Sequence, residues 1–215
     1  MAKILDLGSG TKSATQAWRA LGHEVITVDW VEEADINGDW CDPETWERIS
    51  ELGPYSFVWF APDCGIFSMA GGLPFDEKKN PTTVRAEREI NGIKYALKKI
   101  LELNPPWGFI MENPRAMMRK MDFVKNLHRV TVSFCQYGDR RMKPTDLFGR
   151  IPYSFRPKMC FAGASCHDAA PRGSKTGTQG MTKKEAGKMP YGLSKAIAEA
   201  VLESKGQTFP SLNDW

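Results

Sequence analysis

The chain has 215 residues, of which 41% are hydrophobic and 26% charged, and its net charge is +3. This length suits one domain, or one domain with a small appendage, and it is long enough to bury a core. No apolar run approaches transmembrane length and no signal peptide precedes the first strand pattern, so we expect a cytoplasmic protein without a membrane segment. The five cysteines favour thiol or metal roles over a disulfide framework.

Charge is unevenly distributed along the chain. Residues 1–63 carry four basic and twelve acidic side chains, whereas residues 64–215 carry 25 basic and 14 acidic ones. Such asymmetry is typical of a chain whose basic part meets a polyanion such as nucleic acid. A solvated basic face without a partner gives the same composition, so both interpretations stand at this point.

The first 29 residues predict a strand–helix–strand unit. Residues 3–7 form an apolar strand, residues 8–11 a glycine turn, residues 13–21 a helix, and residues 23–29 a second strand that ends on Asp29. Glycines let the main chain approach a ligand closely, and an acid about 20 residues later can bind ribose hydroxyls. The third glycine of dinucleotide sites is missing. The pattern therefore indicates another nucleoside ligand, with a plain tight turn as the alternative.

The middle of the chain places a cysteine at a strand end. We expect a short strand over residues 35–40, a helix over 43–52, an apolar strand over 55–60 and a covering helix over 81–103. Cys64 follows the apolar strand in a loop rich in glycine and proline, where α/β proteins gather catalytic groups. We interpret it as a nucleophile, and a buried free thiol is the alternative.

The second half predicts three more strands and a closing helix, over residues 107–111, 129–135, 145–148 and 192–204. Glu112 stands at the end of the first of these strands, where an acid is either functional or a solvated loop residue. The third strand returns antiparallel to its neighbours. The whole order predicts an α/β protein with an open, mostly parallel seven-stranded sheet, one antiparallel strand, and helices on both faces.

A cysteine–histidine pattern occurs in residues 150–190, which show no clear periodicity. Cys160, Cys166 and His167 form a Cys-x5-Cys-His sequence, and Cys135 at a nearby strand end offers a fourth ligand. A structural zinc ion would hold together a segment with so little core of its own. The spacing is not that of a standard zinc knuckle, so ordinary thiols are the alternative.

Together these motifs resemble the DNA cytosine-C5 methyltransferases, and especially the short enzymes encoded by bacteriophages. The resemblance covers most of the chain in order and implies a Rossmann-like class I methyltransferase fold that binds S-adenosylmethionine. Asp29 is similar to the family's ribose-binding acid, Trp30 to its adenine-stacking neighbour, and Asp39 to the acid that faces the adenine amino group. The implied cofactor-binding residues are Asp6, Leu7, Gly8, Ser9, Gly10, Asp29, Trp30, Asp39, Trp40, Pro62 and Ser194.

The resemblance further implies methyl transfer to C5 of cytosine in DNA, through a covalent bond between Cys64 and C6 of the base. The base must be flipped out of a duplex or be single-stranded already. Glu112 would bind or protonate N3 of the ring. The implied catalytic residues are Cys64, Glu112, Arg141 and Lys143. The implied substrate-binding residues are Pro62, Asp63, Ser68, Asn113, Pro114, Arg140 and Thr145.

The sequence departs from the family pattern next to the nucleophile. Asp63 and Gly65 stand where the family usually has a proline and a glutamine, and Arg141 with Lys143 stands for a glutamine and an arginine. A carboxylate beside a thiol opposes thiolate formation unless a cation or the loop turns it away.

The chain is also short for the family. Residues 1–150 would form the catalytic core, residues 151–189 a small basic insert in place of a large target-recognition region, and residues 190–215 a helix that completes the core. We expect a monomer that acts on cytosine-containing DNA, in the host cytoplasm if a phage encodes it. The small insert leaves RNA or free cytidine nucleotides as alternative substrates. Two further alternatives are the transfer of a modified methyl group from a cofactor analogue and a catalytically silent DNA-binding protein that keeps the fold.

Overall fold

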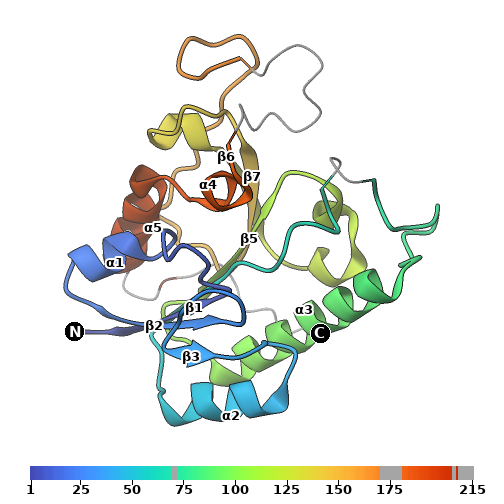
Figure 1. Ribbon diagram of the computed structural model, residues 1–215. Helices are drawn as coiled ribbons and strands as arrows, with labels where there is room; N and C mark the ends of the chain where they lie inside the picture. The colour runs from blue at the N-terminus through green and yellow to red at the C-terminus, as the bar shows by residue number, and fades with distance from the viewer. Residues whose placement is uncertain (69–71, 170–180, 205–206, 208–215) are drawn as a thin grey trace.

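The computed structural model describes residues 1–68, 72–169, 181–204 and 207 (Figure 1). The basic stretch 171–180 and most of the tail after residue 204 lie outside these ranges. One sheet has the strand order β3-β2-β1-β4-β5-β7-β6. Its strands are β1 (Lys3–Leu7), β2 (Glu24–Asp29), β3 (Ile36–Asn37), β4 (Phe57–Phe60), β5 (Phe109–Pro114), β6 (Arg129–Ser133) and β7 (Pro144–Gly149). Strand β7 is antiparallel to both of its neighbours, and the other pairs are parallel, so the predicted sheet is confirmed.

Helices cover both faces of the sheet (Figure 1). On one face lie α2 (Pro43–Glu51) and α3 (Val84–Leu103), and on the other lie α1 (Gln16–Ala20) and α5 (Tyr191–Ser204). Each face of the sheet has its own hydrophobic core. Strand β4 contributes side chains to both cores, because successive side chains of a strand point to opposite faces. Val58 and Phe60 pack with α3, whereas Phe57 and Trp59 pack with α1 and α5. Among the helices described, none is both long and apolar enough to cross a membrane.

Three predicted elements are shorter than their patterns suggested. Helix α1 begins only at Gln16, because the polar side chains before it bond elsewhere: Thr15 Oγ1 donates to Asp6 Oδ2 and Ser13 Oγ accepts from the Met189 amide. Helix α3 begins after Thr83, whose hydroxyl accepts from the Ala86 amide and caps the helix. Strand β6 stops at Ser133, where a 3-10 turn replaces the end of the predicted strand.

Four short helices were not expected from the sequence. They are η2 (Met117–Lys120), η3 (Asp122–Val124), η4 (Phe134–Tyr137) and α4 (Lys183–Gly187). Each is too short to show helical periodicity. Helix α4 starts with a capping box between Thr182 and Glu185, which is readable in the sequence as Thr-x-x-Glu.

Strand β5 is longer than predicted at its carboxyl end. Glu112, Asn113 and Pro114 belong to the strand, because they pair with Leu147, Asp146 and Thr145 of β7. The sequence suggested that they follow the strand. Pairing with an antiparallel neighbour therefore fixes the main chain of all three residues, and with it the direction of their side chains.

A close contact between Cys41 and α3 explains why Gly92 lies in the middle of the longest helix. A Cβ atom at Gly92 would lie 2.2 Å from Cys41 Sγ. We expect Gly92→Ala to lower the free energy of unfolding by about 1–3 kcal/mol through overpacking. In a Cys41→Ala background the same change should raise the free energy of unfolding by about 1 kcal/mol, because alanine has a higher helix propensity than glycine. Urea unfolding of the four proteins measures this coupling, and additive effects would contradict it.

Candidate active site

The carboxyl ends of β4 and β5 bring Cys64 and Glu112 together. Phe60, the last residue of β4, is paired with Met111, so the loop that carries Cys64 leaves the sheet beside Glu112. Two main-chain hydrogen bonds fold this loop: the Phe67 amide donates to the Cys64 carbonyl at 3.1 Å, and the Met117 amide donates to the Phe67 carbonyl at 3.2 Å. Pro62 is buried, and Ser68 is partly exposed at the far end of the loop.

The surroundings of Cys64 keep its thiol protonated. Burial raises the pKa of Cys64, the negative charges of Glu112 and Asp63 raise it further, and the ammonium group of Lys143 lowers it. The thiol form therefore dominates at neutral pH, and the thiolate must form when a proton is removed during reaction. Lys143 is the cation that opposes the two carboxylates at this site.

The carboxylate of Asp63 is engaged by α3. Arg85 Nη2 donates to Asp63 Oδ2 at 2.8 Å, and the Gly65 amide donates to Asp63 Oδ1 at 3.0 Å. This arrangement supplies the compensating cation that the Asp-Cys sequence requires. We had assigned no chemistry to the long helix, so Arg85 was missed. The signal that points to it is the need of Asp63 for a positive partner, together with the arginines in the first turns of that helix.

Polar atoms of Glu112 and Asn113 are buried without a partner. Glu112 Oε1 and both side-chain amide atoms of Asn113 have no hydrogen-bond partner among the described residues. Burial raises the pKa of Glu112, Lys143 opposes the shift, and Asp146 adds to it. A raised pKa favours the protonated carboxyl group, which can donate a hydrogen bond. Unpartnered buried polar groups are costly, so a ligand that supplies their missing bonds would bind favourably here.

The turn of residues 138–143, here called the basic turn, joins η4 to β7. Arg141 lies buried in it: its guanidinium forms an ion pair with Asp139 and donates to the Ala186 and Lys188 carbonyls at 2.7 and 3.1 Å. Four of its five N–H donors are therefore used within the protein. Arg141 therefore organises the turn and α4, and its expected contact with substrate stays a prediction.

Lys143 and Arg140 have more accessible positions than Arg141. Lys143 Nζ donates to the Ala186 carbonyl at 3.1 Å and lies 4.6 Å from the centre of the Phe134 ring. The Arg140 side chain is 54% exposed and lies 3.9 Å from Asp168. Thr145 is buried, donates to the Lys143 carbonyl and pairs with Pro114, so it holds the turn against β5.

The glycine turn after β1 forms an open cradle. Gly8 and Gly10 have φ angles of +74° and +46°, and a Cβ atom at Gly10 would meet no atom within 4 Å. At Gly8 a Cβ atom would lie 2.4 Å from the Ala61 carbonyl oxygen, so the turn packs against the start of the cysteine loop. Leu7, Asp6 and Ser9 are buried. Asp6 Oδ1 and Ser9 Oγ have no partner among the described residues, which marks the same edge of the sheet.

Asp29 and Trp30 flank this cradle at the end of β2. Asp29 accepts hydrogen bonds from the amides of Gly10, Val31 and Glu32 at 2.8, 2.9 and 2.9 Å. A carboxylate has about four acceptor sites, so roughly one remains for a ribose hydroxyl. Trp30 is 60% exposed, and its ring is available for stacking.

Two of the other residues expected at the cofactor, Asp39 and Ser194, already have partners within the protein. Asp39 accepts from the Cys41 amide and from Arg88 Nη2, at 2.9 and 2.7 Å. Ser194 Oγ donates to the Ala14 carbonyl and accepts from the Ala17 amide, which ties α5 to α1. Trp40 is buried with an unpartnered Nε1 atom among the described residues.

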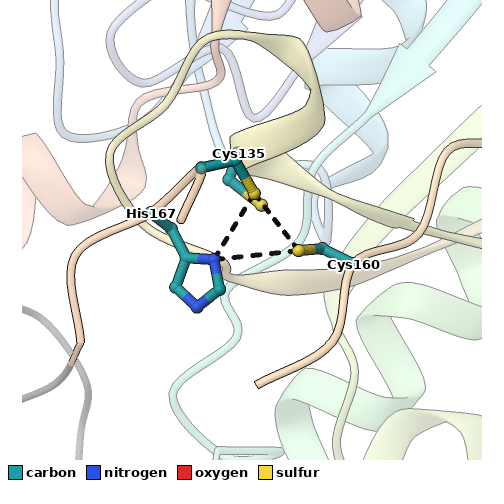
Figure 2. Close-up of side chains that lie close together, drawn as sticks. Cys135, Cys160 and His167 are labelled. Carbon is teal, nitrogen blue, oxygen red and sulfur yellow. Dashed lines mark hydrogen bonds between the residues drawn. The ribbon is translucent and has the colours of Figure 1, made fainter. Parts of the chain in front are cut away.

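The four residues expected to bind metal come together at the end of β6 (Figure 2). Their ligand atoms, three Sγ and one imidazole nitrogen, all lie within 4.8 Å of one another. Figure 2 shows that Cys135, Cys160 and His167 point toward a common centre. We call this group, which is completed by Cys166, the cysteine–histidine cluster.

Comparison with known proteins supports the fold. No protein-family model and no curated protein matches the sequence. Among solved structures, the methyltransferase EhMeth of Entamoeba histolytica is similar with a TM-score of 0.51 and 12% identity, over 75% of this chain and 57% of that chain. A candidate DNA modification methyltransferase encoded within a prophage (E. coli) is similar with a TM-score of 0.50 and 16% identity, over 75% of this chain and 52% of that chain. The chain thus has the class I methyltransferase fold and spans a little over half the length of these two proteins.

The effect of Asp63 on the nucleophile can be measured directly. We expect Asp63→Asn to lower the pKa of Cys64 and to speed its alkylation by iodoacetamide at pH 7 by about threefold or more. Arg85→Met leaves the Asp63 carboxylate uncompensated and should slow the reaction. Mass spectrometry of the Cys64 peptide gives both rates. The Cys41 peptide serves as the control, and equal rates in all three proteins would contradict this account.

The protonation of Asp6 should appear in the stability of the protein. Burial raises the pKa of Asp6 from 3.8 to about 7, so the native state holds the proton more tightly than the unfolded state. The stability due to the protonated side chain is present below pH 3.8 and is lost as the pH rises to about 7. The free energy of unfolding of the Asp6→Asn protein, relative to that of the parent, should therefore rise by up to about 4 kcal/mol as the pH increases across this range. Urea unfolding at several pH values tests this, and parallel stability curves would refute it.

Proposed function

We propose that this protein transfers a methyl group from S-adenosylmethionine to C5 of cytosine in DNA. The observation that carries the proposal is the convergence of Cys64, Glu112 and Lys143 at the carboxyl edge of a methyltransferase-type sheet. The same edge holds a glycine cradle with unpartnered buried polar atoms. The fold, the residue types and their order along the chain agree with this function.

The residues at the end of β1 and β2 fit the proposed cofactor. Gly10 leaves the cradle open, Asp6 Oδ1 and Ser9 Oγ lack partners among the described residues, and Trp30 exposes a ring for an adenine base. Asp29 would offer its remaining acceptor site to the ribose. When bound, the cofactor supplies an electrophilic methyl group on a sulfonium sulfur. Ser194 and Asp39 act by fixing α5 and the loop after β3 around this site.

Cys64 supplies what cytosine lacks as a methyl acceptor. C5 of cytosine is a poor nucleophile, and addition of the Cys64 thiolate at C6 makes the ring an enamine whose C5 is nucleophilic. After C5 has taken up the methyl group, loss of the C5 proton and breakage of the Cys64–C6 bond restore the aromatic ring. Because the thiol is protonated at rest, its proton must leave as the bond to C6 forms.

Glu112 and Lys143 would balance the charge during this addition. A protonated Glu112 can donate to N3 of the ring and so absorb the negative charge that develops there. Asn113 follows Glu112 on β5, where successive side chains point to opposite faces of the sheet, and its side-chain amide has no partner among the described residues. Lys143 favours the thiolate of Cys64, since its positive charge lowers the pKa of that thiol.

The substrate would be a base outside the helical stack. Cys64 cannot reach C6 of a paired cytosine, so the base must be flipped or single-stranded. Lys143 and the exposed Arg140 are suited to neighbouring phosphates. The small insert at residues 151–189 favours a substrate that makes few contacts with the protein. Single-stranded DNA, RNA and cytidine nucleotides therefore stay candidate substrates.

One experiment separates these substrates. The protein is incubated with S-adenosylmethionine labelled in its methyl group and with duplex DNA, single-stranded DNA, RNA or dCMP. Mass analysis of the product nucleosides then identifies the base and the transferred group. We expect 5-methylcytosine from DNA. Label in RNA or dCMP alone would replace DNA as the substrate, and cofactor binding without any transfer would favour a silent DNA-binding protein.

Replacement of the nucleophile gives the sharpest test of the mechanism. Cys64→Ala should lower methyl transfer by more than about 1,000-fold, because no bond to C6 can form. Calorimetry should find S-adenosylmethionine affinity within about twofold of the parent, since the thiol lies outside the glycine cradle. Cys41→Ala removes a thiol away from the site and should keep its activity. Turnover by the Cys64→Ala protein would refute the nucleophile.

A further inference from the structure

Residues 156–169 have no apolar core to hold them. They contain no helix or strand, and none of them is buried. Hydrogen bonds attach their two ends to the catalytic core: the Ser133 amide donates to the Lys158 carbonyl at 2.9 Å, and the Asp168 amide donates to the Arg140 carbonyl at 2.8 Å. A typical hydrogen bond contributes only about 1 kcal/mol of net stability, so we expect a further interaction to fix the segment.

The cysteine–histidine cluster lies where this segment meets η4. Cys135 belongs to η4, and the other three members belong to the segment. Cys160 Sγ lies 3.3 Å from Cys166 Sγ, and His167 Nδ1 lies 3.7 and 3.6 Å from these two sulfur atoms. A tetrahedral zinc site with ordinary bond lengths separates two sulfurs by about 3.8 Å, and a sulfur from a nitrogen by about 3.6 Å. The cluster is therefore close to the size of a zinc site before any metal is added.

We propose that the cysteine–histidine cluster binds a structural zinc ion that fastens residues 156–169 to the basic turn. Three cysteines and one histidine fill all four positions of a zinc ion, which is the pattern of structural sites. Neighbouring groups support the ligands as they do around bound metals: Gln136 Nε2 donates to Cys166 Sγ at 3.3 Å, and the Cys160 amide donates to Ser133 Oγ at 3.0 Å.

The metal would act on the active site through the main chain. The Asp168 amide, one residue after the ligand His167, bonds the carbonyl of Arg140 in the basic turn. On the other side of the cluster, the Lys158 amide donates to the Tyr137 hydroxyl at 3.0 Å, just before that turn. Zinc would thus hold the basic turn at Arg140 and at Tyr137, which directly precedes it. This positioning role rests on the proposed function, whereas the metal site itself does not.

The alternative for two of these thiols is a disulfide. Cys160 and Cys166 are close enough to pair after a small movement, although their separation of 3.3 Å exceeds a disulfide bond of about 2.05 Å. A disulfide would remove two ligands and exclude the metal. Mass analysis of alkylated protein with and without reduction separates the two states.

Metal analysis of the full chain, purified under reducing conditions without added zinc, tests the site. We expect about one zinc ion per chain, and replacement by cobalt(II) should give the thiolate charge-transfer absorption of a tetrahedral site. Cys160→Ala and His167→Ala should each lower the metal content by at least about tenfold. Cys41→Ala, which also removes one thiol, should keep it. Reduced thiols with no bound metal and no cobalt spectrum, or a Cys160–Cys166 disulfide, would overturn the proposal.

Proteolysis reports the tether independently of catalysis. Lys158 is exposed and is followed by Met159, so trypsin should cut after Lys158 once the segment is released. We expect a chelator to speed this cleavage by about tenfold or more and added zinc to reverse it, while circular dichroism of the core stays the same. Cleavage that ignores the metal would overturn the tether. Full methyl transfer by the metal-free protein would refute only the positioning role, and failed transfer by the zinc-loaded protein only the proposed function.

Discussion

The antiparallel pairing of β7 with β5 determines the geometry of the candidate site. It extends β5 through Glu112 and Asn113, so these side chains stand on a paired strand instead of a loop. It also sets the start of β7 beside the end of β5, where the Arg115 amide donates to the Pro144 carbonyl at 2.9 Å. Lys143 precedes Pro144 and is thereby brought to a position where its charge acts on both Glu112 and Cys64. A parallel strand in this place would deliver its amino end to the opposite edge of the sheet.

The same edge concentrates the unfavourable features of the fold. Asp6, Ser9, Glu112 and Asn113 each bury a polar atom without a partner among the described residues, and Asp6 and Glu112 both have raised pKa values because of burial. Strands β1 and β5 are otherwise well paired and packed. Native proteins leave few buried polar groups unsatisfied, and those they keep need an explanation. These unpartnered groups lower the stability of the unliganded protein. The proposed cofactor and base would supply the missing hydrogen bonds.

The sequence predicted the fold well because each central strand is a short apolar run that ends at a polar or glycine turn. It also predicted Cys64, in the loop after β4, and Glu112, at the carboxyl end of an apolar run, as site residues, and their roles stay predictions. The partners of these residues were harder to foresee. Arg85 is 22 positions from Asp63, and Arg141 bonds to carbonyl groups more than 40 positions away, so only the folded chain shows that one arginine compensates the loop and the other is buried. The cysteine–histidine cluster was visible as a pattern, but its compactness depends on where η4 places Cys135.

Two cations of the basic turn, Arg141 and Lys143, have opposite electrical consequences. Arg141 is paired with Asp139, so its charge is cancelled within a few ångströms and acts little beyond the turn. Lys143 is held by the carbonyl oxygen of Ala186, a neutral group, so its position is fixed while its charge remains uncancelled by that contact. The turn therefore uses one cation to fix its own conformation and a second cation to act on the candidate site, which a single ion pair could not do. Arg141 fixes the conformation of the turn. Lys143 contributes the positive charge that lowers the pKa of the Cys64 thiol and of the Glu112 carboxyl group.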